Sequence, residues 1–142
     1  GENGDCQVLD SIEYTWKNTL SLMGWNVEID GLSVVFDKII PDFITKELPN
    51  VLKNFSRKNF DGYILHSGGM RIIEAYKKIF KNDKTIKESQ KILSKFGNVS
   101  SVSVLLVLIE IIKKKYSGTF MMGALGPGFT AGLTSLKLRS DD

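Results

Sequence analysis

An almost uninterrupted apolar segment, Val99 to Ile112, constrains the fold of this chain more than any other feature. Its apolar residues surround a helix axis nearly completely and many are β-branched, so the pattern alone fits either a strand or a buried helix. The segment is longer than an ordinary strand, and Lys113 to Lys115 follow it where cations offset the negative end of a helix dipole. We therefore predict a helix buried among other elements.

Residue patterns toward the two ends of the chain predict two β-hairpins. From Trp25 to Phe36 apolar and polar residues alternate, and Asp30-Gly31 interrupts them with residue types that suit a type I′ turn. Further on, Thr119 to Leu125 and Thr130 to Leu138 have the residue types of two strands that Gly126-Pro127-Gly128 joins.

A helix is predicted directly after the first hairpin. Pro41 suits a first helical turn, where a missing N–H costs little, and apolar residues follow at helical spacing as far as Phe55. Pro49 lies inside this pattern and removes a backbone hydrogen bond, so we expect a kink or a restart there.

A short apolar strand is predicted from Asp61 to His66, and the turn Ser67-Gly68-Gly69 closes it. The helix that follows has its apolar face between Ile72 and Phe80. Thr85 and Glu88 have the spacing of a capping box for a third helix, which Gly97 is placed to end in the left-handed conformation. His66 is thereby predicted at a strand-to-helix junction.

This order of elements predicts the α/β class, with a mixed sheet, packed helices and one buried central helix. The length of 142 residues indicates a single domain. We place that domain at residues 21–139, between a polar leader over residues 1–20 and a polar tail over residues 140–142.

Charge and residue counts exclude several function classes. The net charge of +3, from 19 Lys and Arg against 16 Asp and Glu, is too weak and too scattered for a nucleic-acid surface. One cysteine, Cys6, and one histidine, His66, form neither an internal disulfide nor a zinc site. No apolar run reaches the roughly 20 residues that span a bilayer. We expect a cytoplasmic chain that binds no nucleic acid, metal or membrane.

Two polar residues at element ends are the candidates for chemistry. His66 ends a buried strand, and Asn98 follows Gly97 directly before the apolar helix. Open α/β sheets place ligands beyond the carboxyl ends of their strands. An imidazole and a carboxamide can each donate a hydrogen bond to one developing oxyanion, whereas Asn98 on its own would also fit a plain helix cap.

Three motifs in one order carry a family resemblance. His66-Ser67-Gly68-Gly69 resembles the His-Pro-Gly-Gly signature of chalcone and stilbene synthases, the type III polyketide synthases. Gly97-Asn98-Val99-Ser100-Ser101 resembles their Gly-Asn-Met-Ser-Ser signature. Gly126 to Thr130 is similar to the second part of their Gly-Phe-Gly-Pro-Gly loop, with Ala124-Leu125 replacing Gly-Phe. The similarity spans residues Ser21 to Leu138.

The resemblance implies the C-terminal half of a thiolase-like fold, in an enzyme that is a homodimer. It implies CoA thioester substrates, namely an acyl-CoA and malonyl-CoA, and no further cofactor. His66 and Asn98 would promote the decarboxylation of malonyl-CoA and hold the oxyanion, while the N-terminal half of the same enzyme would supply the nucleophilic cysteine. Cys6 lies too close to His66 in sequence to match that cysteine, so we expect the isolated chain to be inactive.

The resemblance also implies a set of substrate-binding residues: Trp25, Val34, Arg71, Ser100, Gly126, Pro127 and Gly128. Arg71 would bind a CoA phosphate, although a solvated arginine fits equally well. Ser100 would line the cyclisation cavity or simply let the helix pack closely. Trp25 stands where plant chalcone synthases carry a small residue and Val34 where they carry a gatekeeping Phe, so a plant-type product is not expected.

Two alternatives stay open. A β-ketoacyl-acyl-carrier-protein synthase III shares the fold and the Cys-His-Asn set, but it usually has His-Gln-Ala-Asn where this chain has His66-Ser67-Gly68-Gly69. A non-catalytic thiolase-like domain, kept for dimerisation or binding, would need neither side chain for chemistry.

Overall fold

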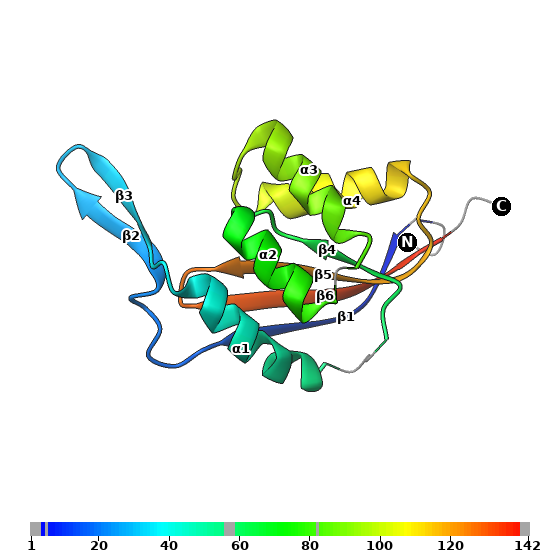
Figure 1. Cartoon of the computed structure of the whole chain (residues 1–142), viewed down its shortest axis with the longest axis horizontal. Coiled ribbons are helices and arrows are strands. Elements are labelled where there is room, and N and C mark those ends of the chain that lie inside the picture. Colours follow the sequence, from blue (N-terminus) through cyan, green and yellow to red (C-terminus); the bar gives the residue numbers. More distant parts are fainter. Residues whose placement is uncertain (1–3, 5, 56–58, 82, 140–142) are drawn as a thin grey trace.

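A four-stranded mixed sheet in the order β1-β6-β5-β4 organises the chain, and the β2–β3 hairpin projects away from it (Figure 1). The computed structural model describes residues 4, 6–55, 59–81 and 83–139. β5 and β6 are antiparallel, and β4 joins β5 as a parallel strand. The strands of the sheet are β1 (Cys6–Thr15), β4 (Gly62–Leu65), β5 (Gly118–Gly126) and β6 (Thr130–Leu138).

Strand β1 was not predicted, because it falls in the stretch 1–20 that we expected to be a polar leader. It pairs antiparallel with β6 from Cys6↔Leu138 to Thr15↔Thr130, and it forms an edge of the sheet. Most of its side chains are exposed or half-buried, and Ile12 packs against the core. The sequence of this strand therefore shows little of the apolar alternation from which a strand can be predicted.

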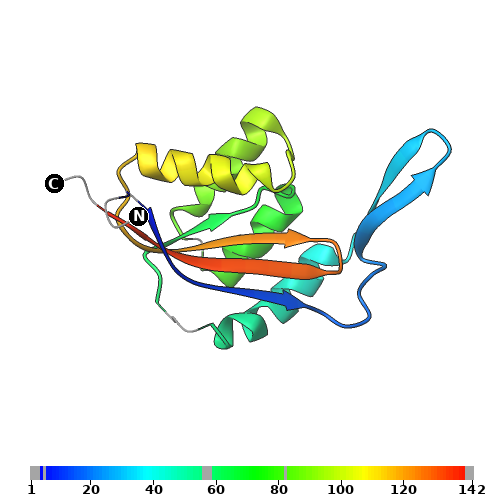
Figure 2. The same ribbon diagram turned by 180° about the vertical axis from the view of Figure 1, so that it is seen from behind.

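Helices cover both faces of the sheet. α1 (Ile40–Lys53) and α2 (Met70–Ile79) pack on the face that carries Leu65, Met121 and Leu133. α4 (Val102–Lys113) packs on the opposite face, against Ile64 and Phe120, and Figure 2 shows it from that side. α3 (Ile86–Phe96) contributes to both cores. Among the described residues, no helix combines the length and the apolarity needed to cross a bilayer.

The first helix begins where the sequence predicts, with Pro41 in its first turn. Of the kink or restart predicted at Pro49, the restart is wrong, because α1 continues through this residue as one helix. Its buried face, formed by Ile44, Leu48 and Val51, lies on both sides of the proline and packs into a single core. This packing stabilises both turns despite the lost hydrogen bond.

The predicted capping box of α3 is also wrong. The Thr85 side chain makes no cap hydrogen bond, because its hydroxyl oxygen accepts from the Tyr63 N–H at 2.7 Å. The Glu88 side chain is fully buried and forms ion pairs with Lys91 and Lys114. Gly97 ends the helix with positive φ, at +72°, as predicted, but its ψ of −162° lies outside the left-handed helical conformation.

The first hairpin consists of β2 (Met23–Glu28) and β3 (Gly31–Phe36), as predicted, but its turn is one residue earlier. Glu28 pairs with Gly31, which leaves Ile29 and Asp30 as the central turn residues in place of Asp30-Gly31. Of these residues only Gly31 has positive φ, at +143°. The glycine therefore serves the start of β3, and the predicted type I′ turn is absent.

The helix prediction for the long apolar segment is confirmed by α4, but its burial is one-sided. Val104, Val107 and Ile111 face the sheet and are buried. Val102, Leu105 and Ile109 on the other side are each about half exposed. These three residues, Val102, Leu105 and Ile109, define the outer face of α4.

Candidate active site

His66 directly follows β4 and begins the turn that leads into α2. Its N–H donates to the carbonyl of Gly123 at 2.9 Å, which continues the parallel ladder by one residue. The side chain is 6% exposed. A Cβ atom at Gly68 would lie 3.3 Å from Nε2 of the imidazole, so the glycine leaves room for the ring. Gly69 has φ of +145°, which only glycine adopts readily.

Asn98 lies in the loop between α3 and α4, and its side chain ties that loop to the His66 turn. Nδ2 donates to the carbonyl of Gly68 at 3.1 Å, and Oδ1 accepts from the N–H of Ser100 at 3.0 Å. The cap of α4 is Ser101, so Asn98 is not the helix cap that it would be by residue type alone. One of the two amide hydrogens on Nδ2 stays available to a ligand.

The structure brings His66 and Asn98 together at one cavity of about 20 Å³. This volume holds about one water molecule, and an acyl chain does not fit into it. The remaining lining residues are mostly apolar and come from both hairpins, α1 and α2: Met23, Phe36, Ile40, Gly68, Ile72, Leu125 and Phe129.

Burial sets the protonation of His66. It lowers the pKa of the imidazole below its ordinary value of 6.5, and a hydrogen bond with the Ser100 carbonyl offsets part of this effect. The ring is therefore neutral at pH 7. On its other side, Nδ1 lies 2.5 Å from Oγ of Ser103, a buried residue of α4. A neutral ring can accept a proton at its free nitrogen, and the amide hydrogen beside it can bind an oxyanion.

The β5–β6 turn lies beside this cavity, but its predicted substrate-binding residues do not line it. Gly126, Pro127 and Gly128 connect the strands, and their neighbours Leu125 and Phe129 line the cavity. The hydroxyl of Thr19 accepts from the Phe129 N–H at 2.6 Å, which holds the turn.

None of the seven predicted substrate-binding residues lines the His66 cavity, and four of them lie outside the β5–β6 turn beside it. Trp25 and Val34 face each other across the first hairpin and are more than half exposed. Ser100 is exposed, in the turn before α4, and has φ of +57°. Arg71 lines a separate groove of about 370 Å³ between α1 and α2, beside Lys38 and Lys78.

Three neighbours of His66 were missed by the sequence analysis. Met23 and Phe36 pair with each other at the base of the first hairpin and line the cavity. Alternation identified the hairpin but not which of its residues reach the site. Ser103 lies 37 residues from His66, and its contact follows no local pattern.

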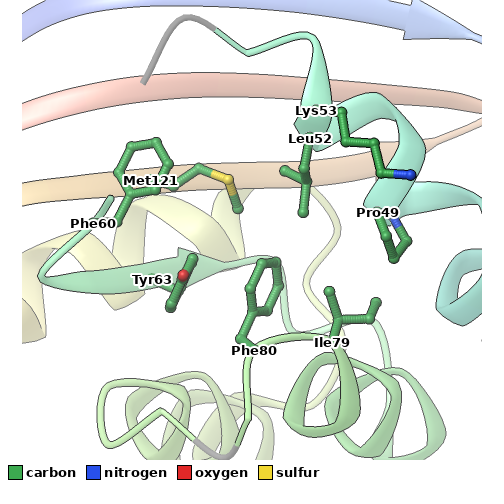
Figure 3. Close-up of a pocket in the computed structure, with 8 residues that line it drawn as sticks. All are labelled: Pro49, Leu52, Lys53, Phe60, Tyr63, Ile79, Phe80 and Met121. Atoms are coloured by element: carbon green, nitrogen blue, oxygen red, sulfur yellow. The ribbon is translucent and has the colours of Figure 1, made fainter. Parts of the chain in front are cut away.

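A second groove, of about 380 Å³, shares no lining residue with the His66 cavity. Figure 3 shows apolar side chains of α1, α2 and β4 turned toward it, with Lys53 at its edge. The rings of Tyr63 and Phe80 stack in its wall with their centroids 4.1 Å apart. It contains no pair of groups suited to acid–base chemistry.

Cys6 lies at the other end of the sheet from His66. Leu65, which precedes His66, is level with Gly123 and Leu133, whereas Cys6 pairs with Leu138. The five residue steps from Leu133 to Leu138 correspond to about 17 Å along a strand. Burial raises the pKa of the Cys6 thiol, which lowers its nucleophilicity at neutral pH.

Comparison with known proteins gives matches along nearly the whole chain. Residues 9–138 match the family model for the C-terminal domain of chalcone and stilbene synthases. A protein of Bacillus subtilis (strain 168) that bears the name chalcone synthase is 30% identical over 137 residues. The 1,3,6,8-tetrahydroxynaphthalene synthase of Streptomyces peucetius subsp. caesius is 31% identical over 134 residues. These alignments cover 89% and 87% of this chain, and 38% and 36% of the relatives.

The fold is similar to that of solved type III polyketide synthases. The crystal structure of 1,3,6,8-tetrahydroxynaphthalene synthase from Streptomyces coelicolor A3(2) superposes with a TM-score of 0.84 at 21% identity. The match covers 96% of this chain and 42% of that enzyme. The chain thus spans about two fifths of the length of the proteins it resembles.

Proposed function

Because the chain belongs to the chalcone and stilbene synthase family, as its C-terminal domain with a thiolase-like fold, we propose that it provides half of a condensing active site. The proposed reaction is the decarboxylative Claisen condensation of an acyl-CoA with malonyl-CoA. His66 and Asn98 are its catalytic residues in this chain, and no cofactor is needed beyond the CoA thioester substrates.

The proposed chemistry begins with a thiolate from the N-terminal half of the enzyme. It attacks the acyl-CoA carbonyl and expels CoA, which leaves the acyl group on sulfur. Malonyl-CoA then loses CO₂, and its electron pair forms an enolate whose oxygen accepts hydrogen bonds from His66 and Asn98. The enolate carbon attacks the bound acyl carbonyl, and collapse of the tetrahedral intermediate expels the thiolate.

The single observation that carries this proposal is the tie between the two candidate residues. The hydrogen bond from Asn98 Nδ2 to the Gly68 carbonyl fixes the amide beside the turn that begins with His66. The second amide hydrogen and the imidazole lie at the same cavity. The amide is thus already in place beside a developing oxyanion, and the imidazole becomes the second donor once the nitrogen that faces the cavity carries a proton.

The exposed outer face of α4 supports the proposal that a second half of the enzyme packs against this chain. Val102, Leu105 and Ile109 expose an apolar stripe on the helix whose first turn holds Ser103 beside His66. A stripe of this kind is typical of a surface that another protein segment covers. We propose that the N-terminal half of the enzyme packs here, that the complete enzyme is a homodimer, and that the 142-residue chain alone has no condensing activity.

CoA recognition is proposed at the Arg71 groove. Arg71, Lys38 and Lys78 bring three cations to a groove that is also lined by Met70, four residues after His66, although Asp42 and Glu74 line it as well. A guanidinium beside ammonium groups suits a phosphate. The acyl starter and the cyclisation mode depend on a cavity that the N-terminal half helps to form.

The test uses the complete enzyme with His66→Gln or Asn98→Ala and measures CO₂ release from malonyl-CoA. We expect each change to lower the rate about 10²- to 10³-fold, since each removes one oxyanion donor. Asn50→Ala, on the exposed side of α1, is the matched control and should retain the full rate. Wild-type turnover in both site variants, with intact circular dichroism spectra, would refute the assigned roles.

The alternatives predict different outcomes. A scaffold domain would have no thiol partner, and mixing this chain with a separately made N-terminal half would restore no malonyl-CoA decarboxylation. A β-ketoacyl-acyl-carrier-protein synthase III would prefer malonyl groups on a carrier protein to malonyl-CoA. The match of residues 9–138 to the chalcone and stilbene synthase model favours the first reading.

A further inference from the structure

Ser103 is the polar residue in closest contact with the His66 ring. Its side chain is fully buried in the first turn of α4. Oγ lies 2.5 Å from His66 Nδ1, 3.1 Å from the backbone nitrogen of Ser67 and 2.8 Å from the carbonyl oxygen of Ser100. All three distances are within hydrogen-bond range.

The hydrogen bonds of the Ser103 hydroxyl determine which nitrogen of the His66 ring carries the proton. A serine hydroxyl has one hydrogen to donate and two lone pairs that accept. The Ser67 N–H can only donate, so it takes one lone pair. The Ser100 carbonyl can only accept, so it takes the single hydrogen. The remaining lone pair of Ser103 faces Nδ1, and a hydrogen bond at 2.5 Å requires the hydrogen to come from the ring.

We propose that Ser103 is a positioning residue that holds neutral His66 in the Nδ1–H tautomer and leaves the lone pair of Nε2 on the open edge of the ring. Two neighbours support this orientation. Gly68 has no side chain to cover Nε2, and the cavity shared with Asn98 lies beside the ring.

This inference rests on the proposed function for its chemical meaning. In the resting enzyme His66 is then a base at Nε2, and Asn98 alone has a free hydrogen to donate. When the incoming thiol transfers its proton to Nε2, the sulfur becomes a thiolate and the ring becomes an imidazolium. Only then does Nε2–H become a donor, so oxyanion binding follows activation of the nucleophile.

The experiment is ¹⁵N NMR of protein labelled at histidine, recorded at a pH where the ring is neutral. The 142-residue chain has one histidine and gives one ring, and in the complete enzyme the His66 signals are those lost in His66→Asn. We expect Nδ1 at the shift of a protonated nitrogen and Nε2 at the shift of an unprotonated one. A ring protonated at Nε2 would overturn the proposal even where Ser103 variants do not fold.

Variants separate positioning from general packing. Ser103→Ala should move the ring toward the Nε2–H tautomer, and Ser103→Thr, which keeps a hydroxyl, should restore the Nδ1–H tautomer. Ser89→Ala is the matched control, because Ser89 is equally buried and donates to the Leu65 carbonyl at 2.8 Å without contacting His66. An unchanged tautomer in Ser103→Ala would contradict the proposal. Failure of the tautomer test leaves the condensation assay unaffected, so the two proposals fail separately.

Discussion

The two hairpins of this chain have similar apolar patterns, but the side chains of one are buried and those of the other are exposed. In β5–β6 the core residues Phe120 and Leu133 are almost completely buried between helices on both faces of the sheet. In β2–β3 every apolar side chain from Trp25 to Val34 is more than half exposed, and Val27 is 87% exposed. Figure 1 shows this hairpin extending away from the sheet and its helices.

Apolar alternation therefore indicates that one face of a hairpin is to be covered, but it does not indicate which part of the protein covers that face. Met23, Trp25 and Val27 share one face of the hairpin with their partners Phe36, Val34 and Leu32. This chain covers only the base of that face, at the His66 cavity. Under the proposed function, the rest of the enzyme covers the remainder.

The largest expected contrast between the hairpins is in stability. Phe120→Ala removes a buried ring from the core under α4 and should lower the free energy of unfolding by about 3–5 kcal/mol. Val27→Ala in the exposed hairpin should change it by less than about 0.5 kcal/mol. Urea unfolding monitored by circular dichroism measures both values. Equal losses would contradict the contrast between the two hairpins.

A smaller effect is expected from backbone strain within β5–β6. Gly118 has φ of +115°, and a Cβ atom there would collide with the Asp61 carboxylate, which accepts from the Thr119 N–H. Gly118→Ala should therefore cost about 1–3 kcal/mol. Gly132→Ala, in the partner strand with open space around the added atom, should be close to neutral. Thermal unfolding of the two variants tests this pair.

The burial of His66, beside the cavity that both hairpins line, makes the stability of the fold depend on pH. Because burial lowers the pKa of His66 below 6.5, the unfolded chain binds more protons than the folded chain between that lowered pKa and 6.5. Stability should rise with pH across this window and fall as the solution is acidified through it. His66→Asn should lose this part of the slope in urea unfolding series, and an unchanged slope would refute it.

A polar substitution on the exposed face of the β2–β3 hairpin should have the smallest effect on stability, but it should change self-association. Val27→Thr keeps a β-branched side chain on the exposed apolar face and should leave the melting temperature unchanged. It should reduce self-association of the isolated chain, measured by sedimentation velocity. Ser33→Thr lies on the opposite face of the hairpin and is the control. Equal association of both variants would show that the apolar face is not the contact.

Local patterns predicted the four helices and, among the described strands, all except β1. Alternation identified both hairpins, helical spacing identified the helices, and the Gly-Gly turn placed His66 at the end of β4. These signals lie within a few residues of one another, so a sequence shows them directly. The structure adds that the Asn98 side chain reaches the turn of His66 through the Gly68 carbonyl.

Features that depend on distant partners were not predicted. Thr85 loses its capping role because Tyr63, 22 residues earlier, uses its hydroxyl. Ser103 contacts His66 across 37 residues, and strand β1 exists because β6 pairs with it. The burial of α4 was overestimated because an apolar helix does not reveal whether its cover belongs to the same chain.

The pairing of β1 with β6 has a consequence for how the chain acquires its structure. Thr15 and Thr130, whose hydroxyls are 2.8 Å apart, are 115 residues apart in sequence. Contacts with such a high contact order form slowly, and a ribosome releases the first strand long before the last. Strand β1 is therefore unpaired until β6 has been synthesised, and we expect its pairing with β6 to be a late step in folding.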